Sequence, residues 1–419
     1  MWQVSNGHLE RLAVFTCVCG EIEAVGELIM NGGGGRRSSF FRYAASWLKQ
    51  AAPPALFPVG LPRRRKVIPS DPHPVPLQLC DAGPDGWGKQ VLDAAYPGFF
   101  FGTAEYLAAA GADRTGELLF GPTPEEGPQR WVPSNREIGD GPARIDELEA
   151  MLAAARAFEA GDADDRQLGL LLRSGTNIGG ARPKIRLRDE KQEWIAKFPA
   201  DGDRIDDPRM EAFCLSLAKV CGIETPDHKL LDVAGQSVLL VARFDRDQER
   251  RLGYLSAASV VGQSAVIYST DVSYAGLAEA ARKAGMEPCA AELFRRLLFN
   301  CVINNADDHL RNHAFIRDVT GWRLSPVFDL VPSYGDRLVL RPAPGEGRRI
   351  DARAALSTYG AFGLTSSQAR SIWQEIEHGL SNTSELLEEY GNNSADCERL
   401  FAMAPELLRF HRSKSNAIL

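Results

Sequence analysis

The chain has 419 residues, of which 44% are hydrophobic and 25% are charged. This composition is typical of a folded globular protein and excludes collagen-like, disordered and coiled-coil classes. Its 48 lysines and arginines against 55 aspartates and glutamates give a formal charge of −7, which disfavours general binding to nucleic acid or to an anionic membrane. At roughly 100–200 residues per domain, the length predicts two or three domains.

The sequence gives no sign of a membrane or export segment. No run of about 18 apolar residues lacks a charge, and the N-terminus lacks the basic region and cleavage site of an export signal. The eight cysteines are scattered and form no CxxC pair, which predicts free thiols. We therefore expect a protein of the reducing cytoplasm.

Residues 1–125 are predicted to form an N-terminal α/β subdomain of short strands and loops. Residues 12–18 and 21–30 are runs of strand length, whereas the prolines recurring over residues 53–76 disfavour regular structure. A group of prolines and glycines over residues 121–134 marks the boundary with the next domain.

Residues 126–246 are predicted to combine a helix with a twisted antiparallel sheet. The helix covers residues 145–160, and a hairpin follows over residues 184–188 and 193–198. Apolar residues at helical spacing predict a second helix over residues 209–220, and residues 237–242 form a further apolar strand.

Residues 247–419 are predicted to be mostly helical. Residues 290–304 carry an apolar stripe at helical spacing, and residues 365–380 and 383–390 are further helix candidates. The expected fold class is therefore α+β, with a sheet-containing lobe followed by a helical lobe.

The densest polar cluster in the chain follows the first of these helices, in the sequence NNADDHLRNH (304–313), between two apolar runs. A polar loop between buried elements is the usual setting of a functional site. Asp307 and Asn312 are five residues apart, which is the interval between the base and the metal-binding asparagine of a kinase catalytic loop. This spacing alone is common by chance.

A second carboxylate, Asp329, lies in the apolar sequence SPVFDL (325–330) and is expected at the end of a buried strand. A buried charge must be paired or bound to a metal. Asn312 and Asp329 would supply the hard oxygen ligands that Mg²⁺ prefers. The alternative is that Asp329 caps the next segment or pairs with an arginine.

A possible phosphate-binding loop covers residues 175–184, in the sequence GTNIGGARPK. Glycines such as Gly179 and Gly180 allow backbone N–H groups to approach phosphate oxygens. The loop matches neither a Walker A motif nor GxGxxG, and alone it is more typical of a turn.

Lys197 lies within an apolar strand and Glu211 on the helix that follows. Lys197 is either a surface lysine or a lysine that binds ATP phosphates and is held by Glu211. The order of glycine-rich loop, strand lysine, helix glutamate, apolar strand, Asp-x4-Asn and a final Asp is that of a kinase.

These motifs resemble those of HipA-type serine/threonine kinases, the toxins of bacterial type II toxin–antitoxin pairs. The resemblance rests on GGARPK (179–184), ARFDR (242–246), NADDHLRNH (305–313) and SPVFDL (325–330). It extends to the N-terminal region through VGEL (25–28), FFRY (40–43), PDGWG (84–88) and DRTG (113–116). It thus covers nearly the whole chain, and the catalytic-loop motif is its most specific part.

The resemblance implies a two-lobed protein-kinase-like fold with an additional N-terminal subdomain, divided into residues 1–125, 126–246 and 247–419. Asp307 would be the catalytic base, and Asn312 and Asp329 would bind Mg²⁺. His309 occupies the position of the catalytic-loop histidine, for which we expect an orienting role.

The resemblance also implies which residues bind ATP. Lys197, paired with Glu211, would contact the phosphates, and the backbone of Ala242 and Phe244 would form the hinge that binds adenine. The glycine-rich loop would contribute Asn177, Gly179 and Gly180.

Members of the family phosphorylate proteins, with aminoacyl-tRNA synthetases as the known type of target, and so arrest translation and growth. They pair with a small helix-turn-helix antitoxin that carries the DNA binding. The resemblance implies both partners for this chain, and DNA would then be bound only indirectly.

One residue departs from the family pattern. A serine commonly lies seven residues before the lysine of the GGARPK motif and is the site of autophosphorylation. Asn177 occupies that position here. Self-inactivation at this loop is therefore either absent or moved to a neighbouring hydroxyl, that of Thr176 or Ser174.

Two alternatives remain. His309 and His313 are four residues apart and would share one face of a helix as zinc ligands in a metal-dependent hydrolase, although the glutamate of HExxH is absent. The other alternative is a pseudokinase, which would regulate a partner without phosphate transfer. The presence of the complete kinase set argues against it: Lys197, Asp307, Asn312 and Asp329.

Overall fold

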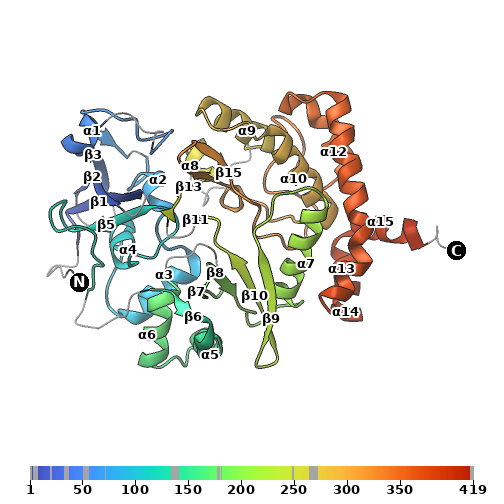
Figure 1. Ribbon diagram of the computed structural model, residues 1–419, viewed down its shortest axis with the longest axis horizontal. Helices are drawn as coiled ribbons and strands as arrows, with labels where there is room; N and C mark the ends of the chain where they lie inside the picture. The colour runs from blue at the N-terminus through green and yellow to red at the C-terminus, as the bar shows by residue number, and fades with distance from the viewer. Residues whose placement is uncertain are drawn as a thin grey trace.

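The computed structural model describes residues 2, 8–18, 21–32, 37–50, 56–70, 72–133, 141–176, 180, 182–247, 250–263 and 272–415. Figure 1 shows three regions side by side: the N-terminal region in blue, a central sheet, and the last helices in red at the opposite end.

The N-terminal region is built on an antiparallel sheet with the strand order β4-β3-β2-β1-β5. Its strands are β1 (Arg11–Val18), β2 (Glu21–Asn31), β3 (Ser38–Tyr43), β4 (Ile68–Pro69) and β5 (Leu118–Gly121). Its helices are α1 (Ala45–Lys49), α2 (Leu77–Cys80), α3 (Gly86–Ala95) and α4 (Thr103–Ala109). The two strands predicted here are confirmed as β1 and β2.

The central sheet has the order β6-β7-β8-β10-β9. Its strands are β6 (Ala143–Arg144), β7 (Lys184–Arg188), β8 (Glu193–Lys197), β9 (His228–Val233) and β10 (Gln236–Ala242). The accompanying helices are η1 (Ile145–Glu147), α5 (Leu148–Glu159), α6 (Asp165–Ser174) and α7 (Asp207–Val220). The predicted hairpin, both predicted helices and the strand at β10 are confirmed, except that residues 145–147 form a 3₁₀ turn.

The sheet differs from the prediction in two ways. Strand β6 pairs with β7 in parallel, so the sheet is not wholly antiparallel. Strand β9 was missed because it lies at the edge of the sheet, where its partly exposed side chains give no apolar run.

Strand β10 separates two hydrophobic cores. Val238 and Leu240 belong to a core that begins at Leu9 and includes the N-terminal region, α5, α6 and strands β7 and β8. Leu239 and Val241 belong to the other core, formed by α7 and the C-terminal helices. This alternation follows from the two-residue period of a strand, and Figure 1 shows α7 between the sheet and helix α13 (Thr383–Glu389).

The C-terminal region is mostly helical, as predicted. Its remaining helices are α8 (Ala257–Val261), α9 (Tyr274–Lys283), α10 (Ala290–Ile303), η2 (Leu310–Asn312), α11 (Ala352–Leu356), η3 (Ser357–Phe362), α12 (Ser366–Gly379), η4 (Leu380–Asn382), α14 (Ser394–Met403) and α15 (Pro405–Ser415). Short strands are β11 (Arg246–Asp247), β12 (Arg250–Arg251), β13 (Gly253–Ser256), β14 (Ala314–Arg317) and β15 (Trp322–Leu324). The antiparallel sheet β13-β14-β15 was not predicted.

Buried charges join the N-terminal region to the end of β10. Arg243 has a 2% exposed side chain and donates to Asp113 Oδ1 at 2.9 Å and to Asp245 Oδ2 at 2.9 Å. Desolvation opposes ionisation of both carboxyls, but Arg243 and its neighbouring arginines hold the pKa of Asp113 and Asp245 below the usual range. The network fixes the segment that was predicted as the adenine-binding hinge.

The free thiols predicted from the sequence are confirmed for Cys17, Cys80, Cys214, Cys221, Cys289, Cys301 and Cys397, while Cys19 lies outside the described residues. In the part of the chain that the structure describes, no helix combines the length and the apolar character needed to cross a bilayer.

Candidate functional site

A cavity of about 810 Å³ lies where the N-terminal region, the central sheet and the C-terminal helices meet. Its lining includes most of the predicted site residues: Gly180, Lys197, Glu211, Ala242, Phe244, Asp307, His309, Asn312 and Asp329. Asn177 and Gly179 lie outside the described residues. The structure therefore brings together residues that are spread over 150 positions of the chain.

The structure places Lys197 and Glu211 in contact, as predicted. Lys197 Nζ is 2.6 Å from Glu211 Oε1 and 2.8 Å from Glu211 Oε2, and it also donates to Asp329 Oδ1 at 3.2 Å. Burial disfavours the charged lysine, but the two carboxylates outweigh that effect and raise the pKa of Lys197. The lysine thus provides a fixed positive charge in the cavity.

Asp329 lies in irregular backbone, because strand β15 ends five residues earlier at Leu324. The expectation that Asp329 ends a strand was wrong. Its φ is +61°, a conformation rare for residues other than glycine, and Glu211 Oε1 accepts its backbone N–H at 3.1 Å. Asp329 pairs with Lys197 rather than with an arginine. Desolvation opposes ionisation of Asp329, but the charges of Lys197 and Lys184 outweigh that effect and lower the pKa of its carboxyl.

The segment predicted as the catalytic loop is held in place by Asn304 at its start. Asn304 ends α10 in the left-handed conformation, with φ +56°, so the chain turns sharply there. Its side-chain Nδ2 donates to the carbonyls of Ser333 at 2.7 Å and Gly335 at 3.0 Å. The loop is thereby fixed to the segment that follows Asp329.

The two neighbouring aspartates of this loop differ in their surroundings. Asp308 is buried and accepts hydrogen bonds from Asn300 Nδ2 at 2.7 Å and His313 Nε2 at 2.8 Å, and from the Tyr274 hydroxyl. Asp307 is exposed and lines the cavity. Asp307 is therefore the carboxylate that a substrate can reach, and Asp308 holds the loop in place.

The electrostatic surroundings of Asp307 suit a proton acceptor. Partial desolvation raises its pKa, Asp329 and Asp308 raise it further, and His309 opposes them. The Asn312 amide Nδ2 donates to the Asp307 carbonyl at 3.3 Å and so holds Asn312 beside Asp307. His309 Nδ1 is buried and, among the described residues, has no hydrogen-bond partner, which leaves it available to a bound group.

The residues predicted to bind Mg²⁺ fit a magnesium ion in their chemistry. Asn312 and Asp329 line the same cavity, and hard oxygen donors such as amide and carboxylate oxygens are the ligands that Mg²⁺ prefers. No group of three or more histidine, cysteine or acidic side chains in the described ranges could hold a metal. Mg²⁺ in nucleotide sites typically uses one or two carboxylates together with phosphate oxygens.

The end of β10 offers a narrow, aromatic edge for a nucleotide base. The Ala242 N–H donates to Asp227 O at 2.8 Å and is therefore not free to contact a base. The Phe244 ring lies 5.5 Å from Phe328 and 6.5 Å from Tyr254, measured between centroids. All three aromatic residues line the cavity.

Sequence reasoning missed Lys184 as a site residue. It lines the cavity, it is 7% exposed, and it is directly opposite Lys197 across strands β7 and β8. Burial, and then the charge of Lys197, lower the pKa of Lys184 to about 8. The signal was present as the lysine of the GGARPK motif, but its position in the cavity depends on the strand register.

The hydroxyls proposed as substitutes for the missing serine are not accessible. Ser174 and Thr176 are both fully buried, and the Thr176 hydroxyl donates to Leu172 O at 3.3 Å. In this conformation neither hydroxyl can reach a bound nucleotide.

The zinc-binding alternative required a helix that places His309 and His313 on one face. The chain instead forms a 3₁₀ turn over Leu310–Asn312, with extended residues on both sides, and His313 is fully buried against Asp308. The helical face on which that alternative depended is not formed.

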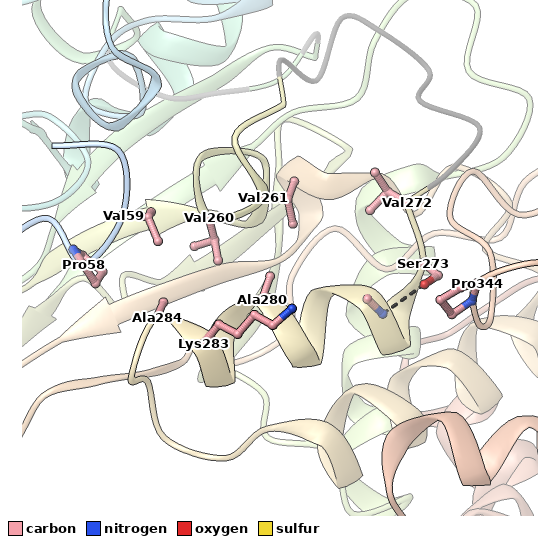
Figure 2. A pocket seen from close by; sticks show the side chains of 11 residues that line it. Pro58, Val59, Val260, Val261, Val272, Ser273, Ala280, Lys283, Ala284 and Pro344 are labelled. Carbon is pink, nitrogen blue, oxygen red and sulfur yellow. Dashed lines mark hydrogen bonds between the residues drawn. The ribbon is translucent and has the colours of Figure 1, made fainter. Parts of the chain in front are cut away.

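A second pocket, of about 450 Å³, lies between residues 58–59 and helices α8 and α9 (Figure 2). Small apolar residues form most of its wall, and its one serine hydroxyl, on Ser273, accepts the Gly276 N–H at 3.0 Å. This pocket holds none of the predicted site residues.

Comparisons with known proteins agree with the geometry. Residues 176–383 match the family described as the HipA-like C-terminal domain. A candidate kinase of Haemophilus influenzae is 26% identical over 220 residues, 45% of this chain and 64% of that protein. The candidate kinase Y4dM of Sinorhizobium fredii is 29% identical over 154 residues, 33% of this chain and 37% of that protein. The chain spans less than two thirds of the length of these curated relatives.

Among solved structures, HipA of Shewanella oneidensis, in a complex with HipB and operator DNA, aligns with a TM-score of 0.66. The alignment covers 95% of this chain and 96% of that chain, at 17% sequence identity, and at this identity it speaks to the fold. The expected two-lobed, kinase-like fold with an additional N-terminal unit is confirmed.

Proposed function

Because residues 176–383 match the HipA-like C-terminal domain, we propose that the chain is an ATP- and Mg²⁺-dependent serine/threonine protein kinase. The observation that carries the proposal is the convergence of the Lys197–Glu211–Asp329 cluster with Asp307 and Asn312 in one cavity. Phosphoryl transfer is a reaction in which each of these residues has a role.

The acceptor hydroxyl oxygen forms a bond to the γ-phosphorus of ATP while the bond from that phosphorus to the bridging oxygen breaks, and ADP leaves with that electron pair. Asp307 orients the hydroxyl and accepts its proton, which the raised pKa of its carboxyl favours. Lys197 holds the phosphates through its fixed charge, and Glu211 keeps Lys197 and the Asp329 backbone in place.

Asn312 and Asp329 would hold Mg²⁺, which when bound neutralises charge on the phosphates. Lys184 adds a second positive charge on the same side of the cavity. The catalytic contribution of the protein is thus positioning and electrostatic stabilisation, which suits a reaction that needs little covalent chemistry from the enzyme.

We further propose that the substrate is a cytoplasmic protein such as an aminoacyl-tRNA synthetase, whose phosphorylation would arrest translation and growth. A small helix-turn-helix antitoxin is the proposed partner, supported by the presence of HipB and operator DNA with the Shewanella HipA. The acidic net charge of −7 fits DNA binding through such a partner.

The test is transfer of labelled phosphate from ATP with Mg²⁺ to proteins in a cytoplasmic bacterial lysate. The protein is compared with its Asp307→Ala variant and with Asp162→Ala, an exposed aspartate outside the cavity, as a matched control. A band labelled by the unmodified protein and by Asp162→Ala, but not by Asp307→Ala, supports the kinase. ATP binding without any labelled band would favour a pseudokinase.

A further inference from the structure

The first residues of helix α3, residues 85–88 of the N-terminal region, contact both sides of the nucleotide cavity. The Asp85 carboxylate forms an ion pair with Arg311 of the catalytic loop. Two residues further, the Trp87 N–H donates to the carbonyl of Gly180 in the glycine-rich loop at 3.0 Å. One short segment is thus bonded to the loop on the phosphate side and to the loop that carries the proposed base.

The Asp85 carboxylate is not used by its own helix. Asp85 occupies the N-cap position of α3, where an aspartate commonly accepts a backbone N–H, but its side chain makes no such bond. Its partners are Arg311 and, at 3.9 Å, Lys89. Asp85 and Arg311 have side chains that are 31% and 38% exposed, so their pairing contributes little to the free energy of unfolding.

The contact with the glycine-rich loop is close because residue 88 is a glycine. A Cβ on Gly88 would lie 2.8 Å from the carbonyl oxygen of Thr176, nearer than side chains approach backbone. Trp87 is 2% exposed and packs edge-on against Phe158 at 5.9 Å, so the segment has little freedom to move away.

We propose that residues 85–88 set the distance between the glycine-rich loop and the catalytic loop, so that Asp85 and Gly88 are positioning residues for phosphate transfer. This inference rests on the proposed function. It assigns the N-terminal region a part in catalysis, because that region keeps the glycine-rich loop at a fixed distance from Asp307.

The first test removes the ion pair with Asp85→Asn, Arg311→Gln and the double variant. We expect each single change to lower kcat by about tenfold, because small displacements of aligned groups are costly, and the double variant to be no worse than either single one. Glu279→Gln, which breaks the exposed Glu279–Arg282 pair on α9, is the matched control and should leave kcat and KM unchanged. If the melting temperatures of Asp85→Asn and of Glu279→Gln change by the same amount, the loss of kcat in Asp85→Asn does not come from partial unfolding.

The second test uses Gly88→Ala, which would push α3 away from Thr176, and measures the dissociation constant of ADP with Mg²⁺. The control is Gly169→Ala in helix α6, where a Cβ meets nothing within 4 Å. We expect Gly88→Ala to weaken ADP binding by about fivefold or more, and Gly169→Ala to have no effect.

The ADP measurement separates the two proposals. If the unmodified protein transfers no phosphate but Gly88→Ala alone weakens ADP binding, the kinase proposal fails, and residues 85–88 keep only the role of holding the glycine-rich loop for nucleotide binding. If Asp85→Asn keeps full kcat in an active enzyme, or Gly88→Ala binds ADP as tightly as the unmodified protein does, residues 85–88 do not position the loop.

Discussion

Lys184 of β7 and Lys197 of β8 stand directly opposite each other on neighbouring antiparallel strands. Like charges in this arrangement repel each other. The protein makes the two ammonium groups unequal: Glu211 holds Lys197 in its charged form, whereas burial and the charge of Lys197 bring the pKa of Lys184 to about 8. A bound triphosphate would offset the repulsion and favour the charged form of both.

We therefore expect ATP binding to depend on the proton of Lys184. The pKa of this amine is lowered, so the group is charged below about pH 8 and loses its charge as the pH rises through that value. ATP affinity should fall by about tenfold from pH 7 to pH 9, the loss of one charge-assisted contact. The measurement is isothermal titration calorimetry at several pH values.

Lys184→Arg is the control, because arginine stays protonated over this range. Its ATP affinity should not change with pH between those limits. A profile in Lys184→Arg that matches that of the unmodified protein would assign the pH dependence to another group.

The adjacent aspartates of the catalytic loop should respond differently to the same substitution. Asp307→Asn should abolish phosphate transfer and leave the melting temperature unchanged, because Asp307 is exposed and its side chain accepts no hydrogen bond from the residues that the structure describes. Asp308→Asn should lower the free energy of unfolding by about 2–4 kcal/mol, because it disturbs a buried carboxylate that accepts three hydrogen bonds. Calorimetric melting together with the transfer assay separates the two, and a stable, active Asp307→Asn would refute the assigned base.

Restoring the serine of the family pattern should create a site of self-modification. Asn177 has no hydroxyl, and Ser174 and Thr176 are buried. We therefore expect no phosphate on residues 174–177 of the unmodified protein after incubation with ATP, and phosphoserine at residue 177 in Asn177→Ser. Phosphopeptide mapping by mass spectrometry tests both expectations, and a phosphate on Ser174 or Thr176 would show that the loop opens.

The buried charges behind the hinge should make the protein sensitive to the loss of Arg243. Arg243→Met removes one of the arginines that pair with the buried Asp113 and Asp245, leaves Arg246 beside both, and should lower the free energy of unfolding by about 1.5–3 kcal/mol. Both carboxyls have lowered pKa values, so their contribution is present above the ordinary aspartate range and is lost as the pH falls. Denaturant unfolding of the unmodified protein should therefore show a loss of stability below about pH 4.

The sequence predicted those parts of the site that local spacing determines. Asp307 and Asn312 lie within one short loop, and Lys197 and Glu211 lie on consecutive elements, so their meeting follows from the order of the elements. The structure adds what depends on distant contacts. Asp85 and Arg311 are 226 residues apart, and no local pattern predicts their pairing.

The backbone of Asp329 and the place of Lys184 could not be predicted for related reasons. The positive φ of Asp329 depends on a bond from its N–H to Glu211, which lies 118 residues earlier. The place of Lys184 depends on the register between β7 and β8, since a shift by one residue would move it to the other face of the sheet. The division into residues 1–125, 126–246 and 247–419 stays a prediction.

The core that begins at Leu9 has a consequence for how this chain is made. That core continues to Leu240 of β10, so it is complete only after more than half of the chain has been synthesised. Contacts so distant in sequence form slowly, and exposed strands aggregate meanwhile. A chain that stops short of β10 lacks Val238 and Leu240 and leaves the neighbouring part of this core open to water, so we expect it to aggregate.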